Sequence, residues 1–415
     1  MTIVVLGNGP AAIAAIEAIR ERDVTSPITL VSKERCAFYS PCSLAEYVEQ
    51  SIARDDLFLR DGDFYLRHGV TTLLGHTAVA IDPVAQLITT ESDGQPMDVR
   101  YERLLIASGA RAVLPPVPGL VGTPGVLTFK TLDDADAINQ HLGNVRHAVV
   151  IGSGFIGLEA AQALHRRGVT VTVLEAMDRV LPQMLDADLA DHVHRRLASF
   201  GVQVLLNSPV RAVLGGSSGV TSVVVDDREI ECQLVVCAAG VRADVAWLES
   251  SGVATARGVI VNDRMETNLV GVYAAGDIVE TGDWAGNVDV IPTWPNAVAS
   301  GRTAGLNIAG QVQHFGGLTA VNVVRIFGEA VSSFGVHHGD QVVSEHGPNG
   351  VRQLTLAQGR IVGGRFIGDI TGAGIYLALM KKQVDVRAQV KVLLSPRFTL
   401  GRLLPAPPGV RIAAA

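Results

Sequence analysis

Residues 3–12 read IVVLGNGPAA, and residues 148–157 read AVVIGSGFIG. In each stretch an apolar run leads into a Gly-x-Gly turn and a helix-like segment, and a second apolar run follows at residues 28–31 and 169–174. The first glycine permits a tight turn, the second lets the backbone approach a pyrophosphate, and the helix N-terminus faces the phosphate charge. One such motif can arise from packing alone, but two copies, each in a full strand–turn–helix–strand context, predict two dinucleotide sites.

The composition is that of a globular chain with material for more than one domain. Of its 415 residues, 48% are hydrophobic and 18% charged, which excludes a disordered chain. The net charge of −7 argues against nucleic acid as a partner. Four cysteines without a C-x-x-C motif exclude a disulfide scaffold, so we expect a cytoplasmic protein. The start carries no basic stretch or cleavage site, and no uninterrupted apolar run reaches about 18 residues, so we expect no signal peptide and no membrane partner.

Three further segments place small-residue turns directly after apolar strands. Residues 101–111 and 234–242 each run from a strand into such a turn, and residues 268–277 end in Asp277. The carboxylate of Asp277 can accept a hydrogen bond from the hydroxyl of a sugar alcohol. Taken singly, each segment could be an ordinary buried strand. Two dinucleotide sites in one chain nevertheless indicate hydride transfer between two cofactors.

Together and in this order, these segments resemble the pyridine nucleotide–disulfide oxidoreductase superfamily of flavoproteins, over nearly the whole chain. The resemblance implies an α/β fold with two Rossmann-like dinucleotide-binding domains, one inserted in the other, and a small C-terminal α+β domain. It implies an FAD-binding domain at residues 1–112 and 243–314 and an NAD(H)-binding domain at 113–242. Residues 315–415 would form a C-terminal interface domain.

The resemblance also implies which residues bind FAD and NAD(H), and it implies no metal ligands. The expected cofactor-binding residues are Gly7, Gly9, Pro10, Ala11, Glu34, Arg35, Val79, Ala107, Ser108, Gly109, Arg111, Lys130, Gly152, Gly154, Ile156, Glu175, Ala239, Gly240, Gly276, Asp277, Trp294, Asn296 and Ala297. Many relatives carry a ribose-binding acid at the position of Ser32, so Glu34 is the expected substitute; a solvated Glu34 is the alternative. Glu175 ends the second apolar run of its motif, where it can bind ribose hydroxyls and repel a 2′-phosphate, which favours NAD(H) over NADP(H).

Three residues are candidates for a catalytic role. Phe155 stands where relatives often place a tyrosine that gates the nicotinamide pocket. Glu159 resembles the acid near the flavin, with an exposed helical glutamate as the alternative. Cys42 resembles the single redox cysteine of coenzyme A-disulfide reductases, NADH oxidases and NADH peroxidases. Pro10 replaces the histidine of the peroxidases, and the Tyr-Ala-Pro-Pro segment of the coenzyme A-disulfide reductases is absent. These departures favour the alternative, a small packing residue at a helix start.

These features predict an FAD-dependent NADH:acceptor oxidoreductase, which passes hydride or electrons between NAD(H) and FAD and on to or from a redox partner. The chain also resembles flavin subunits that link NAD to iron–sulfur partners in larger oxidoreductase complexes. Residues 380–415 hold seven Lys and Arg against one Asp, and such a patch steers an acidic partner. We therefore expect an iron–sulfur protein subunit, or a homodimer, as the partner. The alternative is an NADH-dependent disulfide (coenzyme A-disulfide) reductase or NADH oxidase that uses Cys42.

Overall fold

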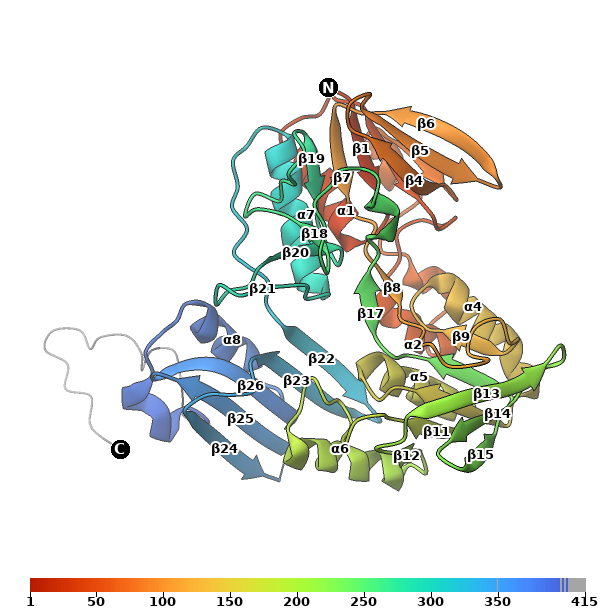
Figure 1. Cartoon of the computed structure of the whole chain (residues 1–415). Helices are drawn as coiled ribbons and strands as arrows, with labels where there is room; N and C mark the ends of the chain where they lie inside the picture. Colours follow the sequence, from red (N-terminus) through yellow and green to blue (C-terminus); the bar gives the residue numbers. More distant parts are fainter. Residues whose placement is uncertain (349, 396–397, 399–400, 402–415) are drawn as a thin grey trace, which may run out of the picture. The chain divides into compact units, whose positions relative to one another are not determined.

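The computed structural model describes residues 1–348, 350–395, 398 and 401. They form two compact units, one of residues 1–176 with 202–319 and one of residues 177–201 with the described residues from 320 onward. The predicted α/β class is confirmed, because the first unit contains two parallel sheets with helices between their strands (Figure 1). In the described part of the chain, no helix has both the length and the apolar character needed to cross a membrane.

The first glycine motif lies in a five-stranded parallel sheet. Its strands are, in order across the sheet, β19 (Val272–Ala274), β7 (Arg103–Ile106), β1 (Ile3–Leu6), β2 (Ile28–Ser32) and β3 (Val70–Leu74). All four pairings are parallel. Every residue of β1 is at most 1% exposed, as expected for a parallel strand whose two faces are both covered. The sheet joins the start of the chain to a strand some 270 residues later.

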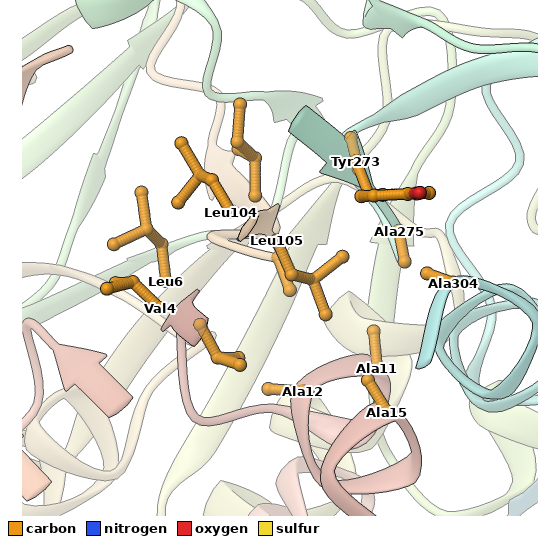
Figure 2. Packing of buried hydrophobic residues seen from close by; sticks show 14 of the residues in the cluster. Val4, Leu6, Ala11, Ala12, Ala15, Leu104, Leu105, Tyr273, Ala275 and Ala304 are labelled. Carbon is orange, nitrogen blue, oxygen red and sulfur yellow. The ribbon is translucent and has the colours of Figure 1, made fainter. Parts of the chain in front are cut away.

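Helices α1 (Pro10–Arg20) and α7 (Trp294–Ile308) pack against each other through small residues. A Cβ on Gly301 would overlap the main chain of Ala11, and a Cβ on Gly305 would overlap that of Ala15. Figure 2 shows Ala11 and Ala15 beside Ala304, with the apolar residues of the sheet next to them. The absence of larger side chains lets the two backbones touch, and this contact fixes α1 against α7.

The second glycine motif lies in a second parallel sheet of the same type. Its strands are, in order, β12 (Gln203–Leu205), β11 (Thr170–Leu174), β10 (His147–Ile151), β16 (Leu234–Cys237) and β9 (Val126–Thr128). Helix α5 (Phe155–Arg166) follows β10 directly, as α1 follows β1. Helix α4 (Leu132–His141) lies between β9 and β10 in the chain and is capped by Thr131, whose hydroxyl accepts from the Asp134 main chain. The chain therefore builds one strand–turn–helix arrangement twice.

Smaller elements complete the first unit. Its antiparallel sheets consist of β4 (Thr77–Asp82), β5 (Leu87–Ser92) and β6 (Gln95–Arg100), and of β13 (Val210–Gly216), β14 (Gly219–Val225) and β15 (Arg228–Glu231). Further strands are β8 (Ala110–Ala112), β17 (Val241–Ala243), β18 (Val259–Ile260), β20 (Val279–Gly282) and β21 (Val288–Asp289). The remaining helices are α2 (Leu44–Val48), α3 (Phe64–Arg67) and the 3-10 turns η1 (Pro41–Ser43), η2 (Arg54–Leu57), η3 (Leu142–Asn144) and η4 (Ala246–Leu248).

The second unit contains one antiparallel sheet and helices, which matches the predicted α+β character of the C-terminal part. The strands are, in order, β22 (Val321–Ile326), β23 (Glu329–Gly335), β26 (Arg360–Gly368), β25 (Gly350–Ala357) and β24 (Gln341–Gly347), followed by α8 (Ala373–Lys381) and η5 (Arg387–Val392). Helix α6 (Ala187–Ser199) belongs to this unit: the Arg196 guanidinium donates to the Phe327 carbonyl at 2.9 Å. Residues 177–201 thus pack with the C-terminal sheet, although they lie inside the range predicted for the second nucleotide domain.

Candidate functional site

The first glycine loop fits a bound diphosphate. Gly7 has a φ of +104°, and a Cβ there would overlap the carbonyl oxygen of Ala107, so only glycine fits. A Cβ on Gly9, in contrast, would meet nothing within 4 Å, which means that the protein leaves space in front of this residue. Helix α1 begins at Pro10 without a side-chain cap. The main-chain N–H groups of its first turn therefore suit a phosphate.

Three strand ends meet at this loop. The Ala107 nitrogen donates to the Leu6 carbonyl at 2.8 Å, and the Ala275 nitrogen donates to Ile106 at 3.0 Å, so β1, β7 and β19 end side by side. A Cβ on Gly276 would lie 2.9 Å from the Ala11 Cβ and 3.9 Å from that of Ala297. The predicted residues Gly7, Ala11, Ala107, Ser108, Gly109, Gly276, Asp277 and Ala297 thus gather at one sheet edge. Such an edge is where open α/β sheets bind ligands.

Asp277 lies at this edge and is partly buried. Burial raises the pKa of its carboxyl, and the nearby Lys130 opposes that rise. The preceding Gly276 nitrogen donates to the Ser300 hydroxyl of α7 at 3.0 Å, which fixes the turn. A partly buried carboxylate is stabilised by hydrogen-bond donors, and the hydroxyls of a sugar alcohol are suitable ones. The surroundings of Asp277 therefore fit its predicted role.

Glu34 follows β2 and is half-buried rather than solvated. The Tyr39 hydroxyl donates to its carboxylate at 2.7 Å and accepts from the Leu132 nitrogen at 2.9 Å. Burial raises the pKa of Glu34, Asp133 adds to this rise, and the Tyr39 hydrogen bond opposes it. The Tyr39 hydroxyl thus holds the carboxylate in place after the end of β2.

The first glycine loop is also held by Tyr65 and Asn8, two residues that were not predicted from the sequence. The Tyr65 hydroxyl donates to the Asn8 side chain at 2.8 Å and accepts from the Phe38 nitrogen at 3.0 Å. The Asn8 amide also donates to the Cys36 carbonyl at 3.2 Å. An asparagine between the two glycines was the available signal, because its side chain must find partners once the loop is packed.

Several of the predicted cofactor-binding residues have other partners. Arg35 pairs with Asp93, Arg111 approaches Asp244 at 3.5 Å, and both arginine side chains are more than half exposed. Val79 is 40% exposed on β4. The Asn296 amide donates to the carbonyls of Ile291 and Thr319 at 2.9 and 3.1 Å, and the Trp294 ring lies 5.9 Å from that of Phe38. The contacts of Asn296 and Trp294 hold the start of α7. Contacts of all these residues with a cofactor stay predictions.

The second glycine loop repeats the geometry of the first. Gly152 has a φ of +103°, and a Cβ there would lie 2.5 Å from the Ala238 oxygen and 3.4 Å from the Ala239 Cα. A Cβ on Gly154 would meet nothing within 4 Å, again leaving space in front of the loop. Helix α5 begins at Phe155 without a side-chain cap. This edge, where Gly240 and Ile156 also lie, fits a second dinucleotide.

Glu175 directly follows β11 and is 7% exposed. Its Oε2 atom accepts hydrogen bonds from the Ser153 nitrogen at 2.8 Å and from the Ser153 hydroxyl at 2.7 Å. The acid predicted for ribose binding is thus tied to the middle of the second glycine loop. Ser153, which the sequence analysis did not single out, makes that connection.

Of the predicted catalytic residues, Glu159 affects the pKa of the Cys42 thiol. Burial raises the pKa of Glu159 to about 7, and Glu46 adds to the rise. Cys42 lies on η1 and is exposed. The surrounding protein nevertheless raises the pKa of its thiol, mainly by desolvation. The carboxylates of Glu159, Glu46 and Asp277 raise the pKa of this thiol further. Phe155, 37% exposed, begins the helix that carries Glu159.

The basic C-terminal residues are partly described. Lys381, Lys382, Arg387 and Lys391 are exposed, and Asp385 pairs with Arg387 at 3.4 Å. The other predicted basic residues, Arg397, Arg402 and Arg411, lie outside the described residues. In the described chain, no group of three or more His, Cys, Asp or Glu is placed to hold a metal ion.

Comparison with known proteins agrees with this geometry. A family profile described as pyridine nucleotide-disulphide oxidoreductase matches residues 1–301. The NADH-dependent phenylglyoxylate dehydrogenase subunit epsilon of Aromatoleum evansii is 30% identical over 412 residues, which cover 96% of each chain. The NADH oxidase of Methanocaldococcus jannaschii is 32% identical over 317 residues, 75% of this chain and 70% of that one. The structure of a NAD-dependent persulfide reductase from A. fulgidus superposes with a TM-score of 0.87 at 26% identity, covering 94% of this chain and 78% of that one.

Proposed function

The chain belongs to the pyridine nucleotide-disulphide oxidoreductase family, and we propose that it is the flavin subunit of a larger electron-transfer enzyme. It is an FAD-dependent NAD(H) oxidoreductase that works with a redox partner. When bound, FAD supplies the chemistry that connects two-electron hydride transfer with one-electron transfer. The partner that we propose is an iron–sulfur protein. The chain's own residues hold the two nucleotides at the two strand-end edges described above.

The observation that carries the proposal is the similarity to a relative named as a subunit over 96% of this chain, and the environment of Cys42 supports it. A redox cysteine reacts as the thiolate, which cations or a helix N-terminus stabilise by lowering its pKa. At Cys42, desolvation and the carboxylates of Glu159, Glu46 and Asp277 raise the thiol pKa instead. This supports an acceptor that takes electrons without forming a bond to a protein thiol.

The extent of similarity supports a subunit role. The phenylglyoxylate dehydrogenase subunit epsilon aligns with 96% of this chain. Because the alignment covers so much of the chain, it includes most of the C-terminal unit. The NADH oxidase aligns with 75%. We therefore propose residues 315–415 as the interface domain that binds the partner, following domains at 1–112 with 243–314 for FAD and 113–242 for NAD(H).

The charge of this region indicates the kind of partner. Lys381, Lys382, Arg387 and Lys391 give four exposed positive charges against Asp385 within eleven residues of chain. The whole chain has a net charge of −7, so this segment differs from the rest. A ferredoxin-like protein with an acidic surface fits such a segment, because opposite charges steer association.

A second candidate uses Cys42 as a redox thiol. The exposed position of Cys42 and the Glu159 pKa of about 7 favour it, because such a carboxyl can exchange protons with a neighbouring group at neutral pH. The persulfide reductase and the NADH oxidase are the relatives that correspond to this alternative. In this case a disulfide, a persulfide or oxygen would be the acceptor.

Anaerobic turnover with NADH distinguishes the two candidates. We expect the flavin-loaded protein to reduce a ferredoxin or a viologen, and to bring an iron–sulfur protein with it when purified from its own cells. We expect only slow reduction of coenzyme A disulfide under the same conditions. If the protein reduced the disulfide faster than either one-electron acceptor, the function that uses Cys42 as a redox thiol would become the favoured one.

A further inference from the structure

Ser153 is the residue that connects the second glycine loop to Glu175. It is fully buried, at 0% exposure, between Gly152 and Gly154. Its main-chain nitrogen and its hydroxyl both donate to the same oxygen of Glu175, at 2.8 and 2.7 Å. Hydrogen bonds to an ionised carboxylate are roughly twice as strong as neutral ones. Two such bonds from one residue restrict the orientation of the carboxylate.

The main chain of Glu175 is fixed independently. Its nitrogen donates to the Leu205 carbonyl at 2.9 Å, and its carbonyl accepts from the Ser208 nitrogen at 2.8 Å. The remaining freedom of Glu175 is therefore in its side-chain torsions. The Ser153 hydroxyl acts on those torsions directly.

We infer that Ser153 determines the preference for NADH over NADPH by holding the Glu175 carboxylate against the glycine loop. The inference rests on the proposed role of Glu175 in binding the ribose hydroxyls. Both hydrogen bonds from Ser153 go to the Oε2 atom of Glu175, and a carboxylate can accept hydrogen bonds at both of its oxygens. A carboxylate held in place also repels a 2′-phosphate, whereas a mobile one can rotate away and let the phosphate enter. Ser153 is thus a positioning residue for nucleotide selectivity.

The test measures binding rather than turnover. Calorimetric titration of the oxidised flavoprotein with NAD⁺ and with NADP⁺ gives the ratio of their dissociation constants. We expect Ser153→Ala, which keeps the main-chain donor and removes only the hydroxyl, to lower the NAD⁺ preference about tenfold. Ser153→Cys keeps the size of the side chain with a weaker donor, and should give an intermediate ratio.

Ser208→Ala is the matched control. Ser208 is 6% exposed and also adjoins Glu175, but its hydroxyl donates to the Leu206 carbonyl at 2.9 Å and not to Glu175. Its removal should leave the nucleotide ratio unchanged. If buried serines in this region had only a structural role, Ser153→Ala and Ser208→Ala would change the ratio of the NAD⁺ and NADP⁺ dissociation constants to the same extent. That result would overturn the inference.

A double-mutant cycle separates this inference from the role of Glu175. Glu175→Gln should remove most of the preference for NAD⁺, and Ser153→Ala should change nothing further in that background. If Glu175→Gln keeps the wild-type ratio, the ribose role of Glu175 is wrong, and the inference fails with it. If Glu175→Gln lowers the ratio and Ser153→Ala does not, only the positioning role of Ser153 is refuted.

Discussion

The Tyr39 hydroxyl donates a 2.7 Å hydrogen bond to the Glu34 carboxylate, and the same oxygen accepts one of 2.9 Å from the Leu132 nitrogen. These bonds connect the loop after β2 with the first residue of α4, 93 residues later in the chain. Burial, with the Glu34 charge as the second cause, raises the pKa of Tyr39, so the hydroxyl stays protonated and remains a donor. One side chain thus joins the two nucleotide-binding halves of the first unit.

Tyr39→Phe should lower the free energy of unfolding by about 1–3 kcal/mol, because it leaves the half-buried Glu34 carboxylate and the Leu132 main-chain N–H without this partner. Tyr101→Phe is the matched control. Tyr101 is 1% exposed, and its hydroxyl has no hydrogen-bond partner among the described residues. Removal of this hydroxyl should leave the free energy of unfolding unchanged. Urea unfolding of both variants checks this prediction, and an equal decrease in the free energy of unfolding of the two variants would contradict it.

Gly9→Val should abolish flavin binding and leave the fold intact. Gly9 has an extended backbone that any residue can adopt, and a Cβ there meets nothing within 4 Å, so the valine enters only the space proposed for the pyrophosphate. Gly7→Ala should instead lower the stability of the fold, because the new Cβ would overlap the carbonyl oxygen of Ala107. Flavin absorbance and thermal unfolding separate the two effects. Full flavin occupancy in Gly9→Val would remove this loop from the FAD site.

The glycine loops were predictable from the sequence because their geometry is local. A tight turn between a strand and a helix needs Gly7 or Gly152 whatever the rest of the chain does. The position of Asn8 between the two glycines signals that its side chain needs a partner, but its contact with Tyr65, 57 residues away, depends on how distant segments pack. The same holds for α6, whose apolar face could pack on either sheet. Arg35 and Val79 came from the resemblance alone, and the structure places both at exposed positions.

Glu159→Gln should stabilise the protein at high pH. The folded state raises the pKa of Glu159 from an ordinary 4.5 to about 7, so folding favours its protonated form. Stability from this group is complete below about pH 4.5 and is lost as the pH rises through 7. The variant avoids that loss, and should exceed the wild type by about 1–3 kcal/mol at pH 8.5 and match it near pH 4.5. Urea unfolding of flavin-free protein at both pH values measures the difference.

Glu46→Gln provides the comparison for that experiment. Glu46 is exposed and is the second cause of the Glu159 pKa rise, after burial. Its removal should therefore recover only a minor part of the gain. If Glu46→Gln stabilised the protein as much as Glu159→Gln, repulsion between the two acids and not burial would dominate.

The paired substitution Lys381→Glu with Lys382→Glu should raise the KM for ferredoxin by about fivefold or more at low ionic strength. The reason is that long-range attraction steers an acidic partner and is screened by salt. NADH-driven flavin reduction should not change. Arg211→Glu with Arg228→Glu, two exposed charges on the β13–β15 sheet, is the control. Equal effects of both pairs would mean that net charge, and not the C-terminal unit, attracts the partner.

The turnover of Cys42→Ser tests the central claim most directly. Serine is nearly isosteric with cysteine and cannot form a disulfide or a persulfide. In a protein that passes electrons from NADH through its flavin to an iron–sulfur partner, this variant should keep most of its NADH-driven reduction of viologen or ferredoxin. If the variant kept its flavin but lost about 100-fold or more of this turnover, the thiol would be catalytic, and the disulfide- or persulfide-reducing alternative would replace the present account.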